Sequence, residues 1–112
     1  MQQTELLKGT LQTIILKLLA DHKRMYGYEI TLKVRELSGG HVQLTEGALY
    51  PTLHKLESDG LLKTDSVPMG KRVRKYYSLT GIGQTSVKTK ISEFTHFIQI
   101  MSRLLQIDPQ IS

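Results

Sequence analysis

The stretch TEGALYPTLHKLESDGLL, which begins at Thr45, predicts one short helix whose two ends are both marked in the sequence. Thr45 suits the N-cap, because its hydroxyl can accept a hydrogen bond from an early backbone N–H. Leu49, Leu53 and Leu56 recur at i, i+4 and i+7 and therefore form one apolar face. Gly60 suits the left-handed residue that closes a helix. Any fold of this chain must bury the leucine face and expose the opposite one.

The exposed face of this helix carries groups able to donate or accept hydrogen bonds. Pro51, in the second turn, lacks the N–H that would bond the carbonyl of Gly47, and its ring crowds that carbonyl. Because Pro51 lies close to the free N-terminal end, we expect it to bend the helix without ending it. A helix that breaks a local rule in this way is typical of one shaped for a function.

Length and charge narrow the class of protein. A chain of 112 residues fits one domain with a modest core. The net charge of +5 and the pI of about 9.6 favour an anionic partner, either nucleic acid or a membrane surface, although many small basic proteins bind no polyanion. Cysteine is absent, which excludes disulfides and thiolate zinc sites. With neither a signal peptide nor a membrane-spanning apolar run, we expect a cytoplasmic protein that does not contact the membrane.

Residues 5–21 predict an amphipathic first helix with a wide apolar face. That width indicates contact with more than one neighbouring element, although a single well-buried core helix explains the pattern equally well. The apolar positions of this face are Leu7, Leu11, Ile14, Ile15, Leu18 and Leu19.

A second helix is predicted over residues 26–38, with Ile30, Val34 and Leu37 on its inner face. The paired glycines that follow disfavour its continuation. Residues 41–44 then alternate and predict a very short strand before the organising helix begins. Two helices joined in this order form the helix-turn-helix plan. The connection is longer than the tight turn of the simplest versions, which indicates a winged variant.

Residues 61–66 and 73–79 predict the two strands of a hairpin, joined by a connection that contains proline and glycine. Four cations fall within five residues at this hairpin, a density that suits phosphate contacts. A solvated loop made basic for solubility is the plainer alternative, but the adjoining exposed helix favours phosphate binding. The cations are Lys71, Arg72, Arg74 and Lys75.

The last helix is predicted to begin at Thr80 and to stop at Pro109, which restricts the residue before it. Its apolar residues are spaced 4, 3, 4, 3 and 4, a heptad seam. A helix of about 25 residues is ~37 Å long, more than a small winged helix body can cover. We therefore expect the seam to meet a second copy, although packing onto the chain's own first helix is an alternative. The residues predicted at the dimer interface are Leu7, Leu11, Val87, Ile91, Phe94, Ile98, Met101 and Leu105.

Sites for metals, nucleotides and catalysis are not predicted. The histidines are scattered and none has a ligand-type neighbour at a known metal spacing; they are His22, His41, His54 and His96. The sequence has no Walker loop, and Gly81-Ile82-Gly83 lacks the third glycine of a dinucleotide fingerprint. No nucleophile stands beside a base. We therefore expect no cofactor, no metal and no enzymatic activity.

Five motifs, taken together and in this order, resemble the PadR family of bacterial transcriptional regulators. They are Glu5–Leu11, Tyr26–Ile30, Glu46–Pro51, Leu56-Glu57 with Gly60–Leu62, and Arg74–Thr80. The resemblance runs from about residue 5 to Gly83, and the short tail is similar to the subfamily with a single C-terminal helix. Residues 23–26 depart from it, since the family more often has a shorter and less basic lead there.

The resemblance implies a mainly α protein with a small β-hairpin, an α+β fold: a winged helix-turn-helix repressor, dimeric through its last helix. Residues 1–79 would form the DNA-binding domain and residues 80–112 the dimerisation helix and tail of one compact unit. The Tyr-Pro helix would enter the major groove of double-stranded DNA at a palindromic operator, with the wing on the backbone. The residues assigned to DNA are Thr45, Glu46, Gly47, Tyr50, Pro51, Thr52, His54 and Lys55 of the helix, with the four wing cations.

Members of the family sense small molecules, often aromatic, near the dimer interface, and some short members stack a tryptophan of the last helix on the ligand. This chain has no tryptophan, and Phe94 occupies the comparable position. Phe94 is also a seam residue, so plain packing explains it as well. The residues assigned to an inducer are Phe94, Phe97 and Met101, with Tyr26 as a further contributor.

Two alternatives to a repressor stay open. One is a winged helix module that binds a partner protein without specific DNA binding. The other is a small-molecule sensor that binds DNA only weakly.

Overall fold

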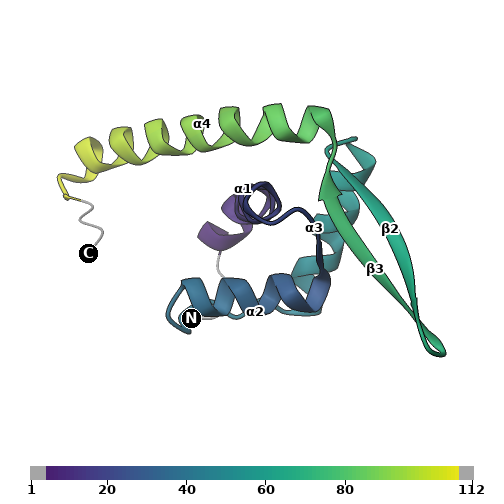
Figure 1. Cartoon of the computed structure of the whole chain (residues 1–112). Helices are drawn as coiled ribbons and strands as arrows, with labels where there is room; N and C mark the ends of the chain where they lie inside the picture. Colours follow the sequence, from purple (N-terminus) through teal and green to yellow (C-terminus); the bar gives the residue numbers. More distant parts are fainter. Residues whose placement is uncertain (1–4, 109–112) are drawn as a thin grey trace.

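The chain is described over residues 5–108 by a computed structural model, in which four helices surround a core flanked by a three-stranded sheet (Figure 1). This is the predicted winged helix-turn-helix, mainly α with a β-hairpin. Its elements, in chain order, are α1 (Glu5–Asp21), β1 (Met25–Tyr26), α2 (Gly27–Leu37), α3 (Glu46–Ser58), β2 (Leu62–Met69), β3 (Arg72–Leu79) and α4 (Gly81–Leu105).

The wing hairpin is longer, and its turn tighter, than the sequence predicted. Strands β2 and β3 pair antiparallel, with Leu62 opposite Leu79 and Met69 opposite Arg72. Only two residues connect them, and the first is Gly70, whose φ of +66° is favoured by glycine. Pro68, which the sequence placed in the connection, lies within β2. It is tolerated there because β2 is an edge strand in the order β1-β3-β2.

The short strand predicted over residues 41–44 is wrong, and a different two-residue strand, β1, takes its place in the sheet. Met25 pairs with Tyr77 and Tyr26 with Tyr76. Residues 42–45 have no regular structure. Instead, the Val42 N–H donates to the Ser38 hydroxyl at 2.9 Å, which ties this segment to the end of α2. The alternation arises because Val42 and Leu44 pack half-buried against the core. It does not come from pairing with another strand.

The core is organised around α1, which contacts α3, α4 and β3 (Figure 1). Its Ile15 and Leu16 are completely buried. The wide apolar face of α1 therefore does serve more than one neighbour, as the sequence indicated. In α2, Ile30 and Val34 are buried as predicted, but Leu37 is wrong as a core residue: it is 69% exposed, in the last turn of α2.

The first turn of α4 is anchored to the backbone that follows α3. Thr80 is the N-cap, and its hydroxyl accepts the Gly83 N–H at 3.0 Å and donates to the Gly60 carbonyl at 2.6 Å. The Thr80 N–H donates to the Leu61 carbonyl at 3.0 Å. Gly83 is buried directly over that carbonyl, with no room for a Cβ. A glycine is therefore required at position 83 for helix and backbone to approach so closely.

The second half of α4 extends past the rest of the chain (Figure 1). The helix has 25 residues, as predicted, but ends at Leu105, where Gln106 adopts the left-handed conformation. The predicted stop at Pro109 lies outside the described residues. Of the residues of α4, Gly83 and Val87 are buried, and Ile91 packs half-buried against the core. Most of the apolar side chains that follow are exposed, among them Phe97, Leu104 and Leu105.

We expect Gly83→Ala to destabilise the fold by about 1–3 kcal/mol, because the new methyl group would clash with the Leu61 carbonyl, a backbone atom that has little freedom to move. The measurement is urea unfolding followed by circular dichroism. Gly81→Ala is the matched control, since a Cβ there meets nothing within 4 Å. Equal midpoints for the two variants would contradict the packing role of Gly83.

Candidate nucleic-acid interface

Helix α3 forms as its sequence predicted. The Thr45 hydroxyl accepts the Ala48 N–H at 3.2 Å, which caps the helix. Leu49, Leu53 and Leu56 are at most 1% exposed. The helix continues through Pro51 in its second turn, although proline cannot supply the backbone N–H that would bond the Gly47 carbonyl. One face of α3 is thus fixed in the core, which leaves the other free to meet a ligand.

The residues predicted to contact DNA lie on three sides of the exposed half of α3. Glu46, Pro51 and His54 are exposed on its outer surface. Lys55 is exposed too, but its Nζ lies 3.0 Å from a carboxylate oxygen of Asp59 one turn later. An exposed pair of this kind is weak and releases its cation readily to a phosphate.

Tyr50 lies on the side of α3 that faces the start of α2. Its ring packs over Gly27, which is buried, and a Cβ at Gly27 would come within 2.9 Å of the Tyr50 Cζ. The Tyr50 side chain remains 37% exposed. Gly27 therefore sets the position of the tyrosine ring at the edge of the outer surface of α3.

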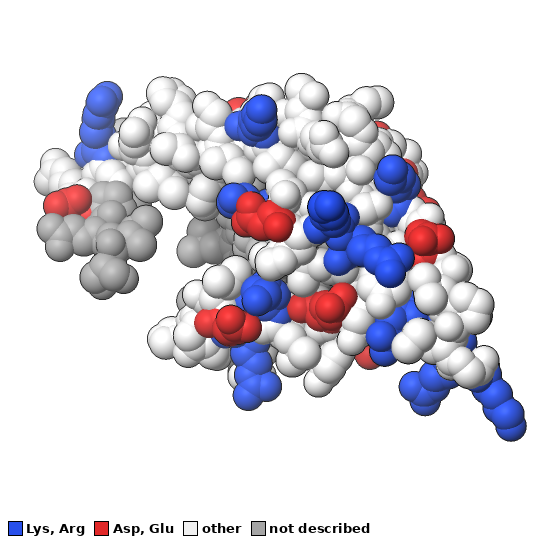
Figure 2. Space-filling model, in the orientation of Figure 1, with Lys and Arg blue, Asp and Glu red and all other residues white. Residues whose placement is uncertain are grey.

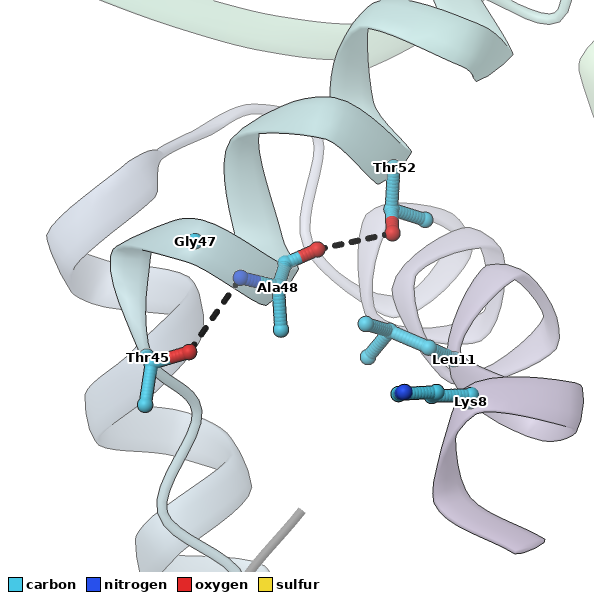
Figure 3. Close-up of a pocket in the computed structure, with 6 residues that line it drawn as sticks. All are labelled: Lys8, Leu11, Thr45, Gly47, Ala48 and Thr52. Carbon is cyan, nitrogen blue, oxygen red and sulfur yellow. Dashed lines mark hydrogen bonds between the residues drawn. The ribbon is translucent and has the colours of Figure 1, made fainter. Parts of the chain in front are cut away.

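Thr52 lies on the opposite side, towards α1, and Figure 3 shows it above Leu11 and Lys8. Its hydroxyl donates to the Ala48 carbonyl at 2.8 Å and is half-buried. A cavity of about 370 Å³ separates the two helices here; it is lined by Lys8, Leu11, Thr45, Gly47, Ala48 and Thr52. The sequence did not single out Lys8 as a site residue, since nothing in its spacing indicates that α1 begins beside the N-terminus of α3.

The wing cations divide into two kinds. Lys71 and Arg72 are exposed at the turn of the hairpin, and no carboxylate of the described residues pairs with them. Figure 2 shows blue side chains extending from this end of the hairpin into solvent. These two residues present their full charge away from the body of the protein, as phosphate contacts require.

Arg74 lies at one end of a stack in which two arginines flank two tyrosines, in the order Arg24, Tyr76, Tyr26 and Arg74. Its guanidinium lies 4.0 Å from the centre of the Tyr26 ring, which meets Tyr76 edge-on at 5.6 Å. Arg24 lies 4.1 Å from the centre of the Tyr76 ring and 3.5 Å from an oxygen of Asp65. A hydrogen bond with Tyr76 raises the pKa of Arg74. The stack fastens the wing to β1, and its members Arg24 and Tyr76 were not predicted as site residues.

Lys75 connects the wing to α3, although its side chain is partly exposed. Its Nζ lies 3.8 Å from Glu57, whose other carboxylate oxygen accepts the Thr64 hydroxyl at 3.4 Å. The same ammonium lies 5.4 Å from the centre of the Tyr77 ring. Burial raises the pKa of the Tyr77 hydroxyl, and the charge of Lys75 acts in the opposite direction. Lys75 therefore helps to fix the angle between the wing and α3.

A groove of about 390 Å³ runs between the wing and the start of α2, beside Tyr50. Tyr28 lines it and is 63% exposed, and the sequence did not predict a site role for it. The groove joins the outer surface of α3 to the wing, so that a ligand of sufficient length can contact both. Its lining residues are Tyr26, Gly27, Tyr28, Tyr50, Met69, Arg72, Val73, Arg74, Lys75 and Tyr77.

The residues predicted at the dimer interface separate into a covered and an uncovered set. Leu7, Leu11 and Val87 are at most 7% exposed and belong to the core of this one chain. Ile91, Ile98 and Met101 are half-buried, while Phe94 and Leu105 are exposed, at 37% and 65%. The predicted ligand residues Phe94, Phe97 and Met101 lie in this second half of α4, whereas Tyr26 lies in the sheet.

Residues 5–108 contain neither a cluster of metal ligands nor a helix suited to span a membrane. No three histidine, cysteine, aspartate or glutamate side chains in this range gather where they could hold a metal ion. No helix in it is both long and apolar enough to cross a membrane.

Comparison of this chain with known proteins identifies the family to which it belongs. The family model described as "Transcriptional regulator PadR-like family" matches residues 15–89. A transcriptional regulator of Mycobacterium tuberculosis is 40% identical over 53 residues, which cover 47% of this chain and 50% of that protein.

Two solved structures are similar over almost the whole chain. A transcriptional regulator from Clostridium thermocellum has a TM-score of 0.82 and 27% identity, with 92% of this chain and 97% of that one covered. A PadR family transcriptional regulator from Eggerthella lenta has a TM-score of 0.78 and 28% identity, with 93% and 88% covered. The chain belongs to the PadR-like family of transcriptional regulators.

Proposed function

We propose that this protein is a homodimeric repressor that binds a palindromic operator. As a member of a family of transcriptional regulators, it is a DNA-binding regulator and not an enzyme. The observation that carries the finer proposal is the placement of an exposed helix face beside a cationic hairpin, both fastened to one core. A helix of the size of α3 fits the major groove, and a wing at its side reaches the flanking backbone.

We assign base contacts to the outer surface of α3 and its Tyr50 edge, and phosphate contacts mainly to the tip of the wing. Lys71 and Arg72 supply the salt-dependent affinity. Arg74 and Lys75 act chiefly by holding the wing in place, because each is already engaged within the protomer. The remaining residues assigned to DNA are Thr45, Glu46, Gly47, Pro51, Thr52, His54 and Lys55.

The second half of α4 supports the homodimer. Phe97, Leu104 and Leu105 are 54%, 69% and 65% exposed, on a helix that extends past its own core. A heptad seam is self-complementary in two copies related by a two-fold axis, which is the usual symmetry of dimers. The same symmetry would bring the two α3 helices to successive major grooves about 34 Å apart.

An inducer site would form only between two copies. In one protomer Phe94 and Phe97 are exposed side chains on a single helix, and they need a facing surface to enclose a ligand. We propose that an aromatic or hydrophobic molecule bound between the two α4 helices, against Phe94, Phe97 and Met101, releases the operator.

The first test is binding to the DNA upstream of the protein's own gene, titrated with salt and with unrelated competitor DNA. We expect tight binding that survives competitor and weakens steeply with salt. Tyr50→Ala should lower operator preference by about 1 kcal/mol or more, the scale of one base contact, and leave nonspecific binding nearly unchanged. Failure to bind any DNA at low salt would favour a protein-interaction module.

Arg72→Ala and Arg74→Ala should weaken DNA binding in different ways, although both residues lie on one face of β3. Loss of Arg72 should reduce the slope of log K against log salt by about 0.9, the value for one phosphate. Loss of Arg74 should reduce the slope by more than this single-phosphate value, because a displaced wing also loses the phosphate contacts of Lys71 and Arg72. Equal changes of slope would show Arg74 to be a phosphate contact as well.

Phe97→Glu should convert the dimer to a monomer, since it places a charge in the proposed apolar interface. Sedimentation velocity at several concentrations measures the change. Gln99→Glu, an exposed position on the polar side of the same helix, is the matched control and should remain dimeric. A Phe97→Glu variant that sediments as a dimer would place the interface elsewhere.

A further inference from the structure

A groove of about 670 Å³ lies where α1 ends, the hairpin begins and α4 starts. Its floor is apolar: Leu19, Leu79 and Val87 are 3%, 7% and 5% exposed. Three elements that are distant in sequence meet here, so the groove is a product of the tertiary fold. The other residues that line it are Ala20, Lys23, Lys63, Ser78, Gln84 and Lys88.

The lysines of this groove differ from most others in the described chain. Each of Lys8, Lys17, Lys33, Lys55 and Lys75 lies within 4.0 Å of a carboxylate oxygen. The lysines without an ion pair in residues 5–108 are Lys23, Lys63, Lys71, Lys88 and Lys90. Three of these five line the one groove, and Figure 2 shows blue side chains gathered over the base of the hairpin near the start of α4. The charge is concentrated at this point and not neutralised.

The groove also offers neutral hydrogen-bonding groups. The side chains of Ser78 and Gln84 make no hydrogen bond to another residue of the described range. Ser78 lies directly opposite Lys63 in the β2–β3 ladder, so both side chains point to the same face of the sheet. Cations, a hydroxyl and an amide around an apolar floor match an anionic group attached to an apolar body.

This groove is separate from the proposed DNA surface. Lys63 is at the start of β2, and the wing tip at Gly70 is seven residues further along, or roughly 23 Å at the rise of an extended strand. Of the residues predicted at the dimer seam, the groove shares only Val87, which is already buried in the core of this chain. Ser92, Thr95 and Gln99 follow Lys88 at i+4, i+7 and i+11, which places Lys88 on the polar side of α4.

We propose that this groove is a binding site for a small organic anion. A carboxylate or phosphate group would lie among Lys23, Lys63 and Lys88, and a short apolar body would lie on the floor. The site joins α4 to the base of the wing, so an occupant would contact both. This inference goes beyond the proposed function, since the groove can bind an anion whether or not the protein binds an operator.

The test is a titration of the ¹⁵N-labelled chain with octyl phosphate, followed by backbone amide shifts. We expect saturable shifts centred on Lys63, Ser78 and Gln84. Octanol, which lacks the charge, should produce none there, and inorganic phosphate should bind about tenfold more weakly, since it gains nothing from the apolar floor.

The double variant Lys63→Gln, Lys88→Gln should bind octyl phosphate at least about tenfold more weakly, through the loss of two charge-assisted contacts. Lys71→Gln is the matched control, because Lys71 also lacks an ion pair but lies at the wing tip. It should bind as the wild type does. Equal binding by all three proteins would overturn the proposal, as would wild-type shifts confined to the exposed apolar face of α4.

A DNA titration separates this site from the operator surface. The double variant should keep the wild-type salt slope on duplex DNA, and Lys71→Gln should lose about 0.9 of it. A slope reduced in the double variant would assign the three lysines to the DNA backbone and refute the small-anion site. If the wild type bound octyl phosphate but did not bind DNA, only the proposed function would be refuted.

Discussion

Complete burial of the leucine face of α3 is the constraint on which the rest of the molecule depends. Leu49, Leu53 and Leu56 are held between α1, α2 and the base of the sheet, and fully burying each side chain is worth about 1.5–3 kcal/mol. A helix fixed so firmly on one side can present unusual chemistry on the other. Pro51 and the half-exposed Tyr50 are tolerated because the core, and not helix propensity, keeps α3 in place.

The helices and their inner faces, apart from Leu37 of α2, could be predicted because each helix carries its information locally. The cap residue Thr45 marks the start of α3, and the heptad pattern indicates the length of α4; both signals can be read from neighbouring residues. The different roles of the wing cations could not be predicted from the sequence. Four adjacent cations look equivalent in sequence, yet only Lys71 and Arg72 are free at the tip, because Arg74 meets Tyr26 and Lys75 meets Glu57 across the fold. Such partners are decided by tertiary pairing and leave no periodic signal.

The strands show the same division between local and distant causes. A two-residue strand such as β1 has no alternation to detect, and it exists because Tyr76 and Tyr77 lie beside it. Residues 41–44 alternate convincingly but pair with nothing in the described sheet, and the Val42 N–H bonds the Ser38 side chain instead of a neighbouring strand. Pro68 signals a turn in most contexts, and only its place on an edge strand makes it acceptable within β2.

The anchoring of α4 by Thr80 and Gly83 has a mechanical consequence. The first turn of α4 is hydrogen-bonded to the backbone that follows α3. Because Gly83 has no side chain, the two segments are in direct backbone contact. Helices α4 and α3 therefore move together as one rigid unit, connected at the backbone of Leu61. In an assembly of two copies that meet through α4, a small change in the angle between the two α4 helices would change the distance between the two α3 helices. If two copies pair as proposed above, contacts at the far end of α4 would then set the distance between the two α3 helices.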